Sequence, residues 1–267
     1  MDRRLFELNA YLDRIGMTPP ARADSAALAA IQRAHRQAIP FENLDILLGR
    51  GIDLAPDAVF DKLVTRRRGG YCFEQNGLFG QALAAMGFAT QRVMARVWLM
   101  DPPATPGRTH VLLHATLSGA SWIADAGFGG GYAPPMPLVA DRIIEDVDVR
   151  HRLRRDSAHG WMLERNGGDG WARQYSFQLD PVHDADIAIA NHWTATAPDS
   201  RFTNGAVLGR ILPDGDVTLI DRRLTRRRAG GGSQREIADP AAYRETLAET
   251  FGIALDEAEV AALPVFA

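Results

Sequence analysis

Apolar residues recur at helical spacing through the first third of the chain. The first stripe predicts a helix that ends at Gly16, and its members are Leu5, Leu8, Leu12 and Ile15. A second helix is expected from Ser25, as N-cap, to Ile39-Pro40, and a third between Ala55 and Val64. A further helix is expected to open at Cys72 and to end at Gly87, with an apolar stripe of Leu78, Phe79, Ala82, Leu83 and Met86.

After Gly87 the apolar period changes from helical to alternating, which predicts strands. The expected strands of the middle third are Gln91–Met100, His110–Leu117, Ser121–Ala124, Trp161–Arg165 and Trp171–Leu179, the last two flanking a glycine-rich hairpin turn. This part therefore reads as an antiparallel sheet or small barrel. From Asn191 the pattern mixes, with expected strands 206–212 and 217–224, a loop at Gly230–Ser233, and a helix capped by Asp239-Pro240 that ends near Gly252.

Composition narrows the class of protein. Hydrophobic residues make up 46% and charged residues 24% of the chain, which is ordinary for a globular protein. The net charge of -3 gives no bulk positive field for nucleic acid or membrane. The first residues carry acids without an apolar core or a cleavage site, and no apolar run approaches a membrane span, so a cytoplasmic protein is expected.

The single cysteine excludes an internal disulfide and a multi-thiolate zinc site, so no metal is expected. A lone cysteine is ordinarily inert core filler. Cys72, however, follows Gly69, Gly70 and an aromatic residue, and it stands at the first turn of its helix instead of on the apolar stripe. Free N–H groups and the helix dipole favour an anion there, and the thiolate is the nucleophilic form of cysteine. Cys72 is therefore a candidate nucleophile.

A cysteine nucleophile needs a base and a group that orients the base. His35 falls in a predicted helix, and His151, His159 and His183 fall in polar stretches where a surface or structural interpretation is favoured; His192 begins the mixed tail. His110 and His114 share one strand and one parity, so both should face the same side of the sheet.

Asp125 is the candidate for the orienting group. It follows four mostly apolar residues, and an acid is costly to bury there unless it is paired. An imidazole Nδ1–H would supply that pairing. A hairpin turn centred on Gly119 would put Asp125 opposite residue 113, nearer His114, whereas His110 is more accessible and a bulge would bring it into reach. The spacing leaves both histidines open.

Several segments resemble the arylamine N-acetyltransferase family. They are residues 39–44 (Ile-Pro-Phe-Glu-Asn-Leu), 67–76 (Arg-Arg-Gly-Gly-Tyr-Cys-Phe-Glu-Gln-Asn), 109–111 (Thr-His-Val), 125–129 (Asp-Ala-Gly-Phe-Gly) and, more loosely, 194–202. The resemblance implies an α+β fold in three parts: a helical bundle (residues 1–88) carrying the cysteine, an antiparallel β-barrel (89–190) carrying the histidine and aspartate, and an α/β lid (191–267).

The resemblance also implies the site and the reaction. It selects His110 over His114, giving a Cys72/His110/Asp125 triad that passes an acetyl group from acetyl-CoA to arylamines or aryl hydrazines by a ping-pong mechanism. It implies Phe41, Val97, Phe128 and Phe202 as walls for the aryl ring, and it implies that Thr109, Gly129 and Gly130 approach CoA. Ala126 stands where a larger aliphatic residue is expected, which would widen the pocket. The arginines between 222 and 228 could meet CoA phosphates, but a solvated face is the favoured interpretation.

Three other interpretations stay open. A cysteine hydrolase of the papain or transglutaminase type uses the same three residue types. An amide synthase that closes a macrolactam is a second option on the same fold, and a non-enzymatic protein with a buried cysteine is the third. Whether the chain is a monomer or a homodimer is not decided by its sequence.

Overall fold

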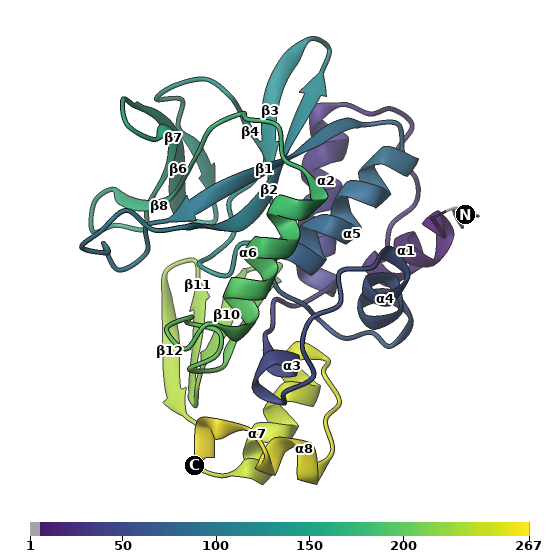
Figure 1. The fold of residues 1–267 in the computed structure, drawn as a ribbon, viewed down its shortest axis with the longest axis vertical. Coiled ribbons are helices and arrows are strands. Elements are labelled where there is room, and N and C mark those ends of the chain that lie inside the picture. The colour runs from purple at the N-terminus through teal and green to yellow at the C-terminus, as the bar shows by residue number, and fades with distance from the viewer. Residues whose placement is uncertain (1–5, 267) are drawn as a thin grey trace.

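The first third of the chain folds into a helical bundle, as predicted. The computed structural model describes residues 6–266 and is shown in Figure 1. Leu5 lies outside the described residues. The helices are α1 (Leu8–Ile15), α2 (Ser25–Ala38), α3 (Leu44–Leu47), α4 (Pro56–Phe60), which continues as a wider π-helical turn (Asp61–Thr65), and α5 (Cys72–Ala85).

One helix start differs from its prediction. Asp24, and not Ser25, caps α2, because the Asp24 carboxylate accepts a hydrogen bond from the Ala27 N–H at 2.9 Å. Asp24 and Ser25 both carry a side-chain oxygen that can cap a helix, and the prediction of Ser25 as the cap is wrong by one residue.

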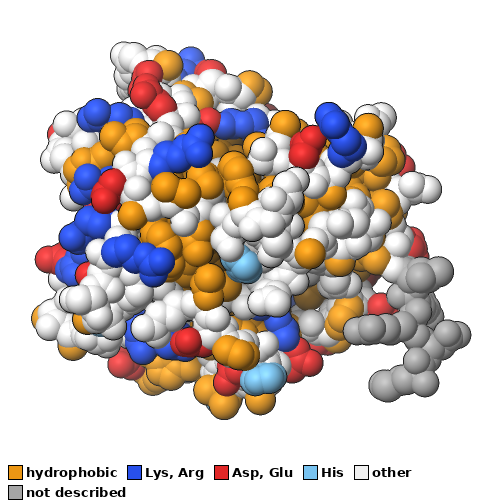
Figure 2. Space-filling model, turned by 90° about the horizontal axis from the view of Figure 1, so that it is seen from above, with side chains coloured by type: hydrophobic (Ala, Val, Ile, Leu, Met, Phe, Trp, Pro, Cys, Tyr) orange, Lys and Arg blue, Asp and Glu red, His pale blue; other side chains and the backbone are white. Residues whose placement is uncertain are grey.

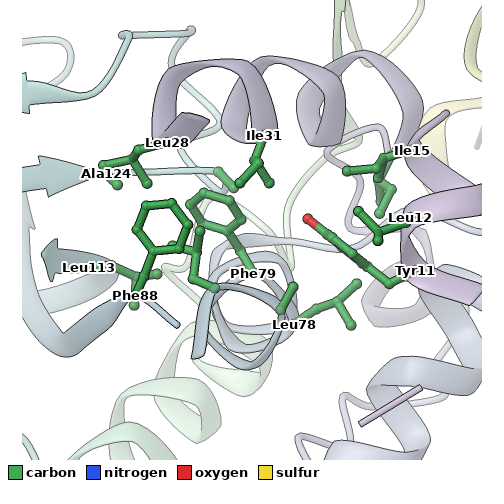
Figure 3. Packing of buried hydrophobic residues seen from close by; sticks show 14 of the residues in the cluster. Tyr11, Leu12, Ile15, Leu28, Ile31, Leu78, Phe79, Phe88, Leu113 and Ala124 are labelled. Atoms are coloured by element: carbon green, nitrogen blue, oxygen red, sulfur yellow. The ribbon is translucent and has the colours of Figure 1, made fainter. Parts of the chain in front are cut away.

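The bundle core joins the helices to the sheet behind them. Figure 3 shows Ile31 of α2, Phe79 of α5 and Tyr11 of α1 pointing toward one another, with Leu113 and Ala124 of the sheet at the same cluster. All five are at most 2% exposed. Each large side chain buried in this way contributes roughly 1.5–3 kcal/mol to folding. The helix that carries Cys72 is thereby fixed against β2, which carries His110, and against β3, which Asp125 directly follows.

The middle of the chain forms one eight-stranded antiparallel sheet in the order β4-β3-β2-β1-β8-β7-β6-β5. Its strands are β1 (Ala89–Val97), β2 (Arg108–Leu117), β3 (Ala120–Ala124), β4 (Met136–Pro137), β5 (Ile144–Asp146), β6 (Val149–Asp156), β7 (Gly160–Asn166) and β8 (Ala172–Phe177). The Asp141 N–H donates to the Leu153 carbonyl at 2.7 Å, so the chain beyond β4 meets β6 and nearly closes the sheet. The predicted α+β class with an antiparallel, barrel-like sheet is confirmed.

The last third contains a second, four-stranded antiparallel sheet in the order β12-β11-β10-β9. Its elements, in chain order, are α6 (Asp184–Thr196), β9 (Val207–Leu212), β10 (Gly215–Ile220), β11 (Arg223–Arg228), β12 (Gly231–Glu236), α7 (Pro240–Thr246), a π-helical turn (Leu247–Phe251), α8 (Glu257–Ala261) and a closing 3-10 turn (Pro264–Phe266). Asp239 caps α7, and Gly252 follows the π-helical turn that continues it, as expected.

Two predictions for this region are wrong. The expected strand 217–224 is two strands that meet at a tight turn, where Asp221 has a φ of 51°. The expected loop at Gly230–Ser233 instead enters strand β12, all of whose residues are exposed. An exposed edge strand needs only backbone pairing to β11, so it lacks the alternating apolar residues from which strands are read.

The expected boundary between residues 190 and 191 falls inside α6, and the large sheet already ends at Phe177. The division into three parts stays a prediction. Figure 1 shows α6 crossing in front, between the large sheet above and the C-terminal elements below. The Phe41 N–H donates to the Gly209 carbonyl at 2.7 Å, which ties the bundle to the small sheet.

The charged residues are dispersed over the surface. On the face in Figure 2, basic and acidic side chains alternate with apolar ones, in keeping with the small net charge. Within residues 6–266, none of the helices has the length and apolar character that crossing a membrane would require.

A buried ion cluster stabilises the loop ahead of α5, and its removal is predicted to be costly. Lys62 Nζ lies 2.8 Å from Asp45 Oδ2 and 2.7 Å from Glu74 Oε1, and Lys62 is only 6% exposed. Burial would lower the pKa of Lys62, but the surrounding carboxylates hold that pKa above its usual value. Lys62→Met should therefore lower the free energy of unfolding by about 3–5 kcal/mol, because two buried carboxylates lose their cation.

Urea unfolding measures this loss, and Arg66→Met is the matched control. Arg66 also pairs with an acid, Asp61, at 2.7 Å, but more than half of each side chain is exposed. An exposed pair of this kind contributes about 0–1 kcal/mol. Equal losses in the two variants would contradict the assignment of a stabilising role to the buried cluster.

Candidate active site

Cys72 is the first residue of α5, as the sequence indicated. It is a free cysteine and is 3% exposed. The Glu74 carboxylate accepts a hydrogen bond from the Tyr71 N–H at 3.0 Å, which fixes the start of the helix. The thiol therefore lies at the positive end of the helix dipole.

The glycines before Cys72 serve close packing. A Cβ on Gly69 would lie 2.3 Å from the Pro40 carbonyl oxygen, and one on Gly70 would lie 2.8 Å from a Glu74 oxygen. Any side chain at these positions would push the loop away from its neighbours. The groups that closely approach Gly69 and Gly70 are therefore the Pro40 carbonyl and the Glu74 carboxylate.

The structure brings His110 and Asp125 together beside this thiol. His110 Nε2 lies 2.7 Å from Asp125 Oδ2, and the two residues are 2% and 6% exposed. The expectation that Nδ1 faces the carboxylate is wrong, because Nε2 makes that contact. Cys72 Sγ lies 3.8 Å from the Thr109 carbonyl oxygen, next to His110 in the chain.

A β-bulge lies beside His110 in the pairing of β1 with β2. Leu113 pairs with Ala124 across β2 and β3, so that pairing is regular up to the residue before Asp125. Between β1 and β2, Ala95 pairs with His110 but Arg96 pairs with Arg108, which leaves Thr109 as the extra residue. Such a bulge re-aims the side chains beside it.

His114 lies further along β2 and takes no part in this pairing. It sits opposite Gln91 and Ile123, and its Nε2 finds no hydrogen-bond partner among residues 6–266. Partial burial lowers the pKa of His114, in keeping with a neutral ring.

The charges of the three groups are coupled. Burial would lower the pKa of His110, but the Asp125 carboxylate and Cys72 together raise it to about 10. Burial would raise the pKa of Asp125, yet His110, Asn76 and the Gly127 N–H hold that pKa below its ordinary value. At neutral pH the pair is therefore an imidazolium and a carboxylate, which places a positive charge beside the Cys72 side chain.

Two polar residues that hold Asp125 had no assigned role in the sequence analysis. Asn76 Nδ2 donates to Asp125 Oδ1 at 2.9 Å. The Tyr175 hydroxyl also hydrogen-bonds to Asp125, and burial together with this carboxylate raises the pKa of Tyr175 well above its usual value. Asn76 lies four residues after Cys72, so helical periodicity placed it on the same face. Nothing in the sequence linked Tyr175 to the site.

The four expected wall residues fall into two groups around the triad. Phe41 and Phe202 pack together with ring centroids 5.9 Å apart, in the same apolar cluster as Cys72. Phe128 meets the His110 ring at 5.2 Å, and Val97 packs against the barrel cluster that includes Phe128. Asn43 fixes the Phe202 segment by donating to the Phe202 carbonyl at 2.8 Å.

The residues expected to approach CoA lie next to these walls. The carbonyl of Thr109 faces the thiol, and Gly129 packs so closely on Phe41 that a Cβ would lie 2.7 Å from the ring. A Cβ on Gly130 would meet Phe128 at 2.6 Å. Both glycines are half-buried.

Two further expectations have clear outcomes. Ala126 does not widen the pocket, because it is fully buried in the core of the helical bundle.

The arginine-rich strand β11 is a solvated face, as interpreted. Arg226 and Arg228 pair with Asp214 at 3.5 and 3.1 Å, and Arg227 pairs with Asp216 at 3.4 Å.

A side chain added at Gly127 is predicted to destabilise the folded protein. A Cβ there would lie 2.7 Å from Asn76 Nδ2 and 2.8 Å from the Cys72 Cα. Gly127→Ala should lower the free energy of unfolding by about 1–3 kcal/mol, because one of these contacts is with backbone and cannot swing aside. It should also change the rate at which iodoacetamide alkylates Cys72, since the displaced segment carries Asp125.

Gly77→Ala is the matched control for that substitution. Gly77 lies on α5 with open space where its Cβ would be, so alanine should stabilise the helix by about 0.5–1 kcal/mol. Thermal unfolding of both variants measures the contrast. A Gly127→Ala protein as stable as the wild type would show that the segment can move away from α5 at no cost.

Comparison with known proteins agrees with this arrangement. The family model described as N-acetyltransferase matches residues 24–260. The arylamine N-acetyltransferase of Escherichia coli (strain K12) is 38% identical over 255 residues, which cover 94% of this chain and 90% of that protein.

Solved structures extend the agreement to the fold. The arylamine N-acetyltransferase of Salmonella typhimurium superposes with a TM-score of 0.91 at 36% identity, covering 96% of this chain and 97% of that one. The Mycobacterium marinum arylamine N-acetyltransferase in complex with CoA gives a TM-score of 0.89 at 34% identity, covering 96% and 98%. By sequence and by fold, the chain belongs to the arylamine N-acetyltransferase family.

Proposed function

We propose that this protein transfers the acetyl group of acetyl-CoA to the nitrogen of arylamines and aryl hydrazines through a thioester on Cys72. The observation that carries the proposal is the buried contact of 2.7 Å between His110 Nε2 and Asp125 Oδ2, beside a thiol at a helix N-terminus. The names of the relatives support an acetyl group and an arylamine acceptor, and the CoA complex of the Mycobacterium marinum protein supports CoA as the carrier of that acetyl group.

The first half-reaction makes the acetyl-enzyme. The Cys72 thiolate attacks the carbonyl carbon of acetyl-CoA, and the carbon–sulfur bond to CoA breaks. The departing CoA thiolate takes the proton of the His110 imidazolium, so that His110 becomes neutral. The first N–H groups of α5 have no partner within the helix, and the Cys72 N–H is proposed to stabilise the oxyanion.

The second half-reaction transfers the acetyl group. The amine nitrogen attacks the thioester, neutral His110 accepts the proton that the nitrogen loses, and Cys72 leaves as a thiolate. An aniline nitrogen is unprotonated at neutral pH and can attack directly. An alkyl amine with a pKa near that of lysine has less than roughly one free base in a thousand there. The triad therefore favours aromatic acceptors.

The apolar residues around the thiol would hold the aryl ring. Phe41, Phe128 and Phe202 are proposed as its walls, with Val97 further along β1. Thr109, Gly129 and Gly130 are proposed to lie along CoA, since the N–H groups of a glycine-rich segment suit phosphate oxygens. A closed, apolar surround also keeps water from the thioester.

The test is a single-turnover experiment with acetyl-CoA and no amine. Free CoA should appear in one equivalent per chain and then stop, and an aniline should restart its release with formation of the N-acetyl product. The acetyl group can be located cleanly, because Lys62 is the only lysine in the sequence and lies buried in ion pairs. If hydroxylamine removes the acetyl label from the protein, the label was bound as a thioester, and Cys72 is the one cysteine of the sequence that can form it.

Other outcomes separate the alternatives. Continuous CoA release at the same rate with and without amine indicates a hydrolase. No release and no acetyl-enzyme, with rapid alkylation of Cys72, indicates an acyl donor other than acetyl-CoA, as in an amide synthase. Slow alkylation of Cys72 at mildly acidic pH indicates an unperturbed thiol and a non-catalytic protein.

A further inference from the structure

Asn76 contacts all three chain segments that carry the proposed triad. It belongs to α5, one turn after Cys72, and is 1% exposed. Its Nδ2 donates to the Val111 carbonyl at 2.7 Å, next to His110, and to Asp125 Oδ1 at 2.9 Å. Its Oδ1 accepts the Ala126 N–H at 2.9 Å.

These partners fix the orientation of the amide. Two acceptors face its nitrogen and a donor faces its oxygen, so the opposite orientation would leave three mismatched contacts in a buried place. The amide therefore locks three segments at once. A residue that only filled space would not need this pattern of donors and acceptors.

The same contact sets the rotation of the Asp125 carboxylate. Oδ1 is held by Asn76 and by the Gly127 N–H at 2.9 Å, which leaves Oδ2 facing His110 Nε2. Gly127 belongs to the same loop as Asp125. Of these two donors, only Asn76 links the Asp125 carboxylate to α5, the helix that carries Cys72. A carboxylate free to turn would hold the imidazolium less well.

We propose that Asn76 is a positioning residue that aligns Asp125 with His110 and holds both against Cys72. The inference rests on the proposed acetyl transfer through Cys72. It assigns Asn76 no contact with substrate. Its effect is on the protonation and alignment of the imidazole, so its loss should lower kcat with little change in KM.

Two substitutions test this role. Asn76→Ala removes all three hydrogen bonds, and kcat should fall about tenfold to hundredfold with KM within about twofold of the wild type. Asn76→Asp keeps the shape but replaces the donor by a carboxylate oxygen against Asp125. At neutral pH it should be at least as impaired as Asn76→Ala, because two carboxylates then face each other.

The pH profile separates positioning from mere structural support. A buried carboxylate beside Asp125 has a raised pKa, and in its protonated form it donates a hydrogen bond again. Activity of Asn76→Asp relative to the wild type should therefore rise as the pH falls from 8 to 5.5, and that of Asn76→Ala should not. Thr246→Val is the control, since its buried hydroxyl bonds only within the C-terminal region.

The outcomes also distinguish this inference from the proposed function. If Cys72→Ala retains amine-dependent acetylation, the triad itself is wrong. If that variant is inactive but both Asn76 variants lose no more activity than Thr246→Val, or both lose activity with the wild-type pH profile, Asn76 is not a positioning residue. Thermal unfolding of each variant shows whether a loss reflects unfolding.

Discussion

Replacing Cys72 by serine should lower amine-dependent acetyl transfer by about 10⁴-fold or more. Below about pH 10 the proton on His110 is held by Asp125 and Cys72, a charge arrangement that suits a thiolate. A serine hydroxyl is far less acidic and stays protonated beside an imidazolium, so the acetyl-enzyme cannot form at a useful rate. Loss of a triad nucleophile in other enzymes has effects of this size.

The measurement is CoA release in the presence of an aniline, together with acetyl label retained on the protein. Cys72→Ser should retain none, and its thermal unfolding should stay close to that of the wild type because the two side chains are similar in size. Gln81→Ser on the same helix is the control, since Gln81 bonds only within α5. More than about one per cent residual activity in Cys72→Ser would mean that the acetyl group does not pass through this residue.

The parts of the fold that the sequence predicted well are those whose packing is local. Helices α1, α2 and α5 each present one apolar stripe to the same core, so their spacing records the contact. Helix α6 was missed because its outer face is apolar as well, with Ile189 71% and Trp193 45% exposed, and no clean stripe remains. Strand β12 was missed for the opposite reason, since all its residues are exposed.

The residues of the candidate site could be named from the sequence, but their geometry could not. Strand parity put His110 and His114 on one face. Continued by one residue, the regular pairing of β2 with β3 places Asp125 opposite Leu112, two residues from either histidine, so spacing alone does not choose between them. Tyr175 arrives from β8, which pairs with β1, and only the sheet order brings it to Asp125.

Asp125→Asn should have the second large effect, lowering acetyl-enzyme formation at pH 7 by about 10²- to 10⁴-fold. The carboxylate is the main force that keeps His110 charged, because it raises a pKa that burial alone would lower. Without it, His110 should lose its proton below its ordinary pKa of 6.5 and be neutral at pH 7. Cys72 would then keep its proton, and no imidazolium would be left to protonate the departing CoA.

The effect of Asp125→Asn on the reactivity of Cys72 can be measured by alkylation with iodoacetamide. In the wild type the imidazolium persists to about pH 10, so the alkylation rate of Cys72 should stay level from pH 6.5 to 8.5. In Asp125→Asn the rate should rise about 50-fold over the same range, as for an ordinary thiol with a pKa of about 8.5. Asp186→Asn at the start of α6 is the control, because that exposed carboxylate bonds only to the His183 N–H. If Asp125→Asn kept the level profile of the wild type, the helix N-terminus would be sufficient to hold the thiolate, and Asp125 would serve only to orient the ring.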